Sequence, residues 1–95
     1  KAGLGTTPVE YGITGNYPNP FNAATDINIL IPEEAQVDFA IYNVRGELVE
    51  TLIRENLPAG SYNFTWQPNN QPSGVYLAVL KTDTNTWKRQ IRFVK

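Results

Sequence analysis

The stretch TDINILIPEEAQVDFAIYNVRG, residues 25–46, decides the fold class. Apolar residues recur at every second position in two runs, first Ile27, Ile29 and Ile31, then Val37, Phe39 and Ile41. A period of two is typical of half-buried β-strands. Pro32 ends the first run, and residues 43–46 predict a hairpin turn in which Gly46 takes a positive φ. The stretch therefore predicts antiparallel β-structure.

The sequence on either side continues the β pattern. Tyr62, Phe64 and Trp66 alternate with polar residues, so all three are expected to face the core. Residues 74–82 are apolar on both faces, as in a central strand, and residues 87–94 form a last strand. Residues 47–54 also fit a helical stripe, but the segment is short and directly follows a turn signal, so we predict a strand.

Turn signals separate these segments roughly every ten residues. They lie at residues 43–46, 57–60, 67–73 and 83–86. With a short strand expected near residues 11–13, the chain holds about seven short strands and no convincing helix. This pattern predicts an all-β fold, an antiparallel immunoglobulin-like β-sandwich. A small closed barrel is the alternative.

The composition excludes most catalytic chemistry. The 95 residues include no His, Cys or Met, so the usual general base, thiol nucleophile and strong transition-metal ligands are missing. Glu33 and Glu34 are adjacent in a turn, whereas glycoside hydrolysis needs two carboxylates that converge across a cleft. We therefore expect no enzyme, no catalytic residues, no cofactor or cofactor-binding residues, no metal site and no small-molecule substrate.

Charge is distributed unevenly along the chain. The net charge is −1, which argues against a nucleic-acid partner held by bulk charge. Residues 81–95, however, hold five of the eight Lys and Arg residues and only one of the nine Asp and Glu residues. In an extended strand Lys88 and Arg92 share one face, while Arg89 and Lys95 share the other. Taken alone, this strip is typical of an edge strand that charge guards against aggregation.

Several segments together resemble a known family. They are Tyr17-Pro18-Asn19-Pro20-Phe21-Asn22, the run 37–49 with Gly46, Leu57-Pro58-Ala59-Gly60, Phe64-Thr65-Trp66, Ser73-Gly74-Val75-Tyr76 and the ending 88–95. In this order the chain is similar to the type A sorting domains of the type IX secretion system, which are related to the immunoglobulin-like domain of flagellar hook-capping proteins. The motif residues through Tyr76 are expected to be structural, with Phe21 closing one end of the core.

The resemblance implies a non-catalytic C-terminal signal that directs an exported cargo protein through the outer-membrane translocon and is then cleaved off. The implied partners are that machinery, its processing protease and an upstream cargo domain in the same chain. The implied location is the periplasmic route to the outer membrane, cell surface or exterior. Residues 15–95 are then the sorting domain, and residues 1–14 are a linker from the cargo. The missing initiator Met agrees with a piece of a longer protein.

The same resemblance makes Lys88, Arg89, Arg92 and Lys95 the expected surface for recognition by the translocon. Two other functions stay open at this point. A sugar-binding face of an accessory module in a secreted enzyme could be lined by Trp66, Trp87, Tyr62, Tyr76 and Phe64, and Trp87 is the one expected to be exposed. A structural or hook-capping-type assembly domain would instead use strand edges to contact other subunits.

Overall fold

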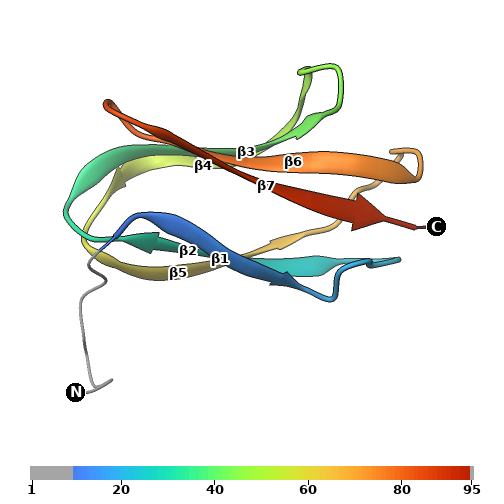
Figure 1. Ribbon diagram of the computed structural model, residues 1–95, viewed down its shortest axis with the longest axis horizontal. Helices are drawn as coiled ribbons and strands as arrows, with labels where there is room; N and C mark the ends of the chain where they lie inside the picture. The colour runs from blue at the N-terminus through green and yellow to red at the C-terminus, as the bar shows by residue number, and fades with distance from the viewer. Residues whose placement is uncertain (1–9, 95) are drawn as a thin grey trace.

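The computed structural model describes residues 10–94, and these form two stacked antiparallel sheets (Figure 1). Residues 1–9 of the expected linker and Lys95 of the expected recognition surface lie outside the described residues. The seven strands are β1 (Gly12–Tyr17), β2 (Thr25–Ile31), β3 (Ala35–Asn43), β4 (Leu48–Leu57), β5 (Gly60–Trp66), β6 (Gly74–Lys81) and β7 (Thr86–Phe93). The first strand begins at Gly12, inside the segment expected to be a linker.

One sheet has the order β1-β2-β5 and the other the order β4-β3-β6-β7. Two separate sheets face each other, so the predicted all-β sandwich is confirmed and the closed barrel is wrong (Figure 1). The fourth strand lies beside the third, whereas in the constant-type immunoglobulin arrangement it joins the sheet of the first, second and fifth strands. The strand prediction for residues 47–54 is also confirmed, because this segment pairs with β3.

The period-two runs bury their apolar side chains between the sheets, as predicted. Ile27, Ile29 and Ile31 of β2 are fully buried, and Val37, Phe39 and Ile41 of β3 are buried opposite them. Burial of each such side chain contributes about 1.5–3 kcal/mol to stability. The alternation therefore fixes both strands with one face toward the core, because a slip of one residue would turn all these side chains to solvent.

Aromatic residues close one end of this core. Phe21 is buried with its ring centroid 5.6 Å from Trp66 and 5.1 Å from Phe93, which confirms its expected place. Tyr76 packs edge-on against Trp66, and its hydroxyl donates a hydrogen bond of 2.5 Å to the Pro72 carbonyl. Burial raises the pKa of the Tyr76 phenol above its ordinary value.

The expectations for the other aromatic residues need two corrections. Trp66 is fully buried as predicted, whereas Tyr62 and Phe64 on the same face of β5 pack against the core but are only half-buried. Trp87 was expected to be the exposed residue among Trp66, Trp87, Tyr62, Tyr76 and Phe64, but it is half-buried and packs against the core. Its ring stacks on Tyr11 at 4.7 Å between centroids, whereas Tyr17 is 82% exposed.

The β3–β4 hairpin has the predicted turn at residues 43–46. Gly46 has a φ of +82°, and its amide donates to the Asn43 carbonyl at 3.0 Å. The Asn43 side chain completes the turn, because its Oδ1 accepts hydrogen bonds from the amides of Arg45 at 2.9 Å and Glu47 at 3.0 Å. Asn and Gly thus supply what this turn needs, a side-chain acceptor and a residue that tolerates a left-handed backbone.

We expect Gly46→Ala to lower the free energy of unfolding by about 1 kcal/mol, because an L-residue strains at this φ while the new methyl group meets no atom within 4 Å. Gly12→Ala is the matched control. Its Cβ also meets nothing within 4 Å, and its φ lies outside the left-handed region, so stability should hold or rise slightly. Urea unfolding of both variants checks this, and equal losses would show that the φ of Gly46 is not the cause.

Candidate functional site

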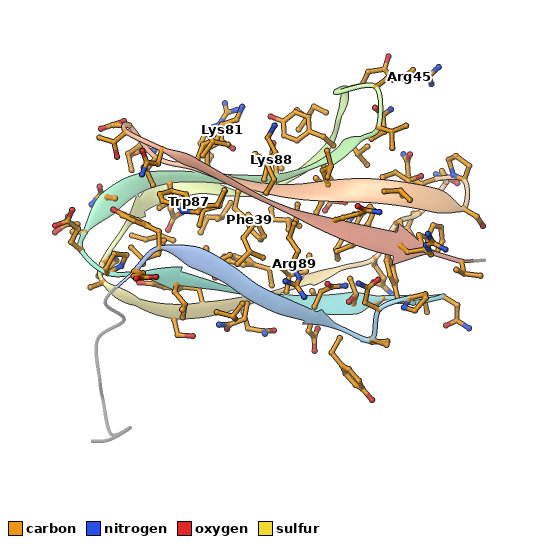
Figure 2. All side chains as sticks on the ribbon, viewed as in Figure 1. Phe39, Arg45, Lys81, Trp87, Lys88 and Arg89 are labelled. Carbon is orange, nitrogen blue, oxygen red and sulfur yellow. The ribbon has the colours of Figure 1, made fainter. Side chains whose placement is uncertain are left out.

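The last strand, β7, forms one edge of the four-stranded sheet and divides the expected recognition residues between its two faces. Lys88 and Arg92 lie on the outer face of the sheet, together with Gln90. Trp87, Ile91 and Phe93 point toward the core, and Arg89 lies on their side of the strand. Figure 2 shows Lys88 pointing away from the three-stranded sheet and Arg89 pointing toward it.

Arg89 has a structural partner. Its Nε donates a hydrogen bond of 3.2 Å to the Oδ1 of Asn16 in β1, across the gap between the two sheets. The side chain is exposed but tied to the other sheet. The geometry therefore places Lys88 and Arg92 on one face of β7 and Arg89 on the other, while Lys95 lies outside the described residues.

Lys81 joins Lys88 on the outer face, because the β6–β7 hairpin pairs Lys81 with Thr86 and Val79 with Lys88. We call Lys81, Lys88 and Arg92 the basic face. Lys81 is not among the recognition residues predicted from the sequence. The register of the hairpin could have identified it, since outward positions on β7 lie opposite outward positions on β6.

A shallow groove of about 400 Å³ runs beside Lys81 and Lys88 on this face. Its lining contains no carboxylate and consists of Tyr42, Gly46, Leu77, Val79, Lys81, Thr86 and Lys88. The Lys81 ammonium lies 5.3 Å from the centre of the Tyr42 ring, and its Nζ is 3.4 Å from the Tyr42 hydroxyl. The groove thus offers apolar surface between two cations.

Apolar side chains support the basic face from below. Ala40 and Val79 are buried, at 1% and 5% exposure, yet they do not belong to the cluster between the sheets. They lie on the outer face of the four-stranded sheet, where half-buried Val75 and Leu77 continue the apolar surface. The prediction that β6 is a central strand with apolar residues on both faces is confirmed, because it lies between β3 and β7.

The acidic side chain of Asp38, beside Lys81, is paired with another cation. Asp38 pairs with Lys81 across β3 and β6 in register, but its Oδ2 lies 3.4 Å from Nη2 of Arg54 in β4. This exposed pair contributes little to stability. It does, however, neutralise the carboxylate beside the groove. The outer face of β6 and β7 therefore presents three exposed cations, Lys81, Lys88 and Arg92, although the whole chain has a net charge of −1.

The Pro-Asn-Pro-Phe motif is hydrogen-bonded to the end of β7. The Phe21 amide donates to the Arg92 carbonyl at 3.1 Å, and the Val94 amide donates to the Phe21 carbonyl at 2.8 Å. The Asn19 Oδ1 accepts a hydrogen bond of 3.0 Å from the Arg92 amide. We call these contacts the seam. Two features that are far apart in the sequence thus form one structural unit, with cis peptide bonds before Pro18 and Pro20.

We expect Asn19→Ala to loosen the seam, because the Arg92 amide loses its acceptor. The free energy of unfolding should fall by about 0.5–1.5 kcal/mol, and hydrogen exchange at Arg92 should accelerate. Asn22→Ala in the same motif is the control, since the exposed Asn22 side chain makes no hydrogen bond to another described residue. Unchanged exchange at Arg92 in Asn19→Ala would contradict this role.

The remaining motif residues occupy positions where strands begin or pack. Gly60 and Gly74 are the first residues of β5 and β6. The indole of Trp66 donates to Glu50 Oε1 at 3.2 Å, and the Pro18 carbonyl accepts a hydrogen bond of 2.8 Å from the Thr25 hydroxyl. Residues 10–94 contain no group of three or more acidic side chains placed to hold a metal ion.

The sequence of the chain also matches a known protein family. Residues 16–94, from within β1 to the residue after β7, match the family described as the secretion system C-terminal sorting domain. No curated protein matches the chain. Over the described part of the chain, no helix has the length and apolar character needed to cross a membrane.

Proposed function

Because the chain belongs to the secretion system C-terminal sorting domains, we propose that its basic face is the surface through which the sorting machinery recognises it. Domains of this family are non-catalytic sorting signals for type IX secretion, and that is the function of this domain. The proposal assigns the recognition to Lys88 and Arg92, with Lys81 beside them and Lys95 as the expected continuation of the strip.

The observation that carries this proposal is the separation of charge on the surface. Lys81, Lys88 and Arg92 are exposed on one face, and the neighbouring groove has no carboxylate in its lining. A face of one sign steers a partner of the opposite sign and sets its orientation. The direct partner in this proposal is a component of the outer-membrane type IX machinery that presents acidic groups.

The proposal extends to the route and the processing of the protein. An upstream cargo domain in the same chain would pass through the periplasm and reach the outer membrane, cell surface or exterior. The processing protease would then cut within the expected linker, residues 1–14, at a bond ahead of Gly12, so that the sorting domain keeps all of β1. The seam supports a cut ahead of β1, because Asn19 and Phe21 hold the beginning of the domain to β7 and would keep the fold closed.

A reporter fusion tests the proposed function. A periplasmic reporter is fused ahead of residues 1–95 in a bacterium with a type IX system, and its fractions in the periplasm and outside the cell are measured. The intact chain should move the reporter out of the periplasm, and removal of residues 88–95 should retain it there. A reporter that stays periplasmic with the intact chain would contradict the sorting role.

A further inference from the structure

The free edge of β7 has backbone groups whose direction is fixed at both ends of the strand. At the hairpin, the Thr82 amide donates to the Asn85 carbonyl at 3.0 Å, so Asn85 faces β6. At the other end, the Arg92 amide and carbonyl point away from β6 and bond to the seam. The pairing of β6 and β7 has no register shift between these points. Alternation then directs the amides and carbonyls of Thr86, Lys88 and Gln90 away from β6.

β1 approaches β7 on this side, where Arg89 bonds to Asn16, but it does not pair with the β7 backbone. In the described part of the chain, no hydrogen bond joins the backbone of Thr86, Lys88 or Gln90 to a segment beyond β7's free edge. The seam occupies the same edge only from Arg92 onward. The free stretch therefore ends just before Arg92, whose amide is bonded to the Asn19 side chain. A hollow of about 290 Å³ lies at this boundary, lined by Asn19, Pro20, Gln90, Ile91 and Arg92. The edge therefore has room beside Gln90.

The side chains along the free stretch define the chemistry of a partner. Lys88 and Arg92 project from the outer face, and Arg89 projects from the inner face. If a second copy of β7 were added at this edge, its cations would lie beside these cations and repel them. This repulsion disfavours pairing of the chain with itself. An extended segment with Asp or Glu at alternate positions would place carboxylates beside Lys88 and Arg92 on the outer face.

We propose that the free edge of β7, from Thr86 to Gln90, binds a short acidic segment of a partner protein as an added antiparallel or parallel strand. This proposal rests on the sorting function and gives its recognition a backbone component. Main-chain hydrogen bonds would supply part of the affinity, and the cations would select an acidic sequence. The seam would set the register, because Asn19 and Phe21 occupy the Arg92 backbone groups and the added strand must end at Gln90.

A proline at position 90 separates this proposal from recognition by side chains alone. Gln90→Pro removes an amide that β6 does not use, and proline is tolerated on such edges, so the β6–β7 pairing should persist. We expect Gln90→Pro to reduce export of the reporter at least tenfold, and the matched Gln90→Ala to export normally. Normal export of Gln90→Pro, or equal loss in both variants, would overturn strand addition. Failure of the unaltered chain to export would instead overturn the sorting function.

A binding measurement keeps the proposal testable if Gln90→Pro does not fold. The probe is a six-residue peptide of alternating Glu and Thr, with a Lys and Thr peptide of the same length as control. We expect the acidic peptide to slow hydrogen exchange at the Lys88 and Gln90 amides of the full chain severalfold, and added salt to weaken the effect. No slowing at millimolar peptide, or equal slowing by the basic peptide, would contradict the proposal.

Discussion

Phe39→Ala is expected to lower the free energy of unfolding by about 3–5 kcal/mol, the largest loss of stability among the predicted variants. Phe39 is fully buried in the middle of β3, and its ring lies 5.5 Å from that of Phe64. Truncation leaves a cavity between the two sheets that rigid strands cannot fill. Since small domains have about 5–15 kcal/mol of stability, urea or thermal unfolding should show a large shift or a chain that no longer folds.

Phe64→Ala is the matched control for this prediction. Phe64 packs on Phe39 from the opposite sheet but is only half-buried, so the same truncation should cost about half as much. The sequence pattern alone places both residues in the core and does not distinguish them. Equal losses for the two variants, or a loss below about 1 kcal/mol for Phe39→Ala, would show that the core is not centred on β3 as described.

The strands themselves were predictable because their signals are local. Ile27, Ile29 and Ile31 alternate with polar residues within one strand, and Asn43 with Gly46 forms the turn within one hairpin. The choice of sheet for β4 is not local. Its two-residue connection to β5 would also suit a hairpin, yet β4 pairs with β3 and the chain crosses to the other sheet at residues 58–59.

The features that could not be predicted from the sequence depend on contacts between residues that are far apart in the chain. Asn19 and Arg92 are 73 positions apart, and no periodicity relates them. The same is true of Trp87 and Tyr11, whose stacking removes Trp87 from the exposed aromatic residues. Such pairs depend on how the first and last strands meet at the edge of the sandwich, which a pattern within one strand does not encode.

The candidate surface was partly predictable, because the alternation of side chains along β7 is a local signal. Alternation along β7 correctly assigns Lys88 and Arg92 to one face and Arg89 to the other. It does not show that Lys81 and Tyr42 line a groove beside Lys88, because these residues come from two other strands. The basic face therefore belongs to the folded sheet, and only part of it can be recognised in the linear charge run.

The double variant Lys88→Glu and Arg92→Glu is expected to reduce the reporter outside the cell at least tenfold. Both side chains are exposed and in no ion pair among the described residues, so the substitutions should change the free energy of unfolding by less than about 1 kcal/mol. They reverse the potential of the face that we propose meets an acidic partner. Export is measured by fractionation, and folding is checked by thermal unfolding of the purified chain.

The most direct test compares the single variant Lys88→Glu with Arg45→Glu, which changes the net charge by the same amount. Arg45 lies at the tip of the β3–β4 hairpin (Figure 2), whereas Lys88 lies on β7. The measurement is the ratio of external to periplasmic reporter for the two variants. The account predicts that only Lys88→Glu loses export. Equal export by both, or equal loss in both, would contradict recognition through the basic face.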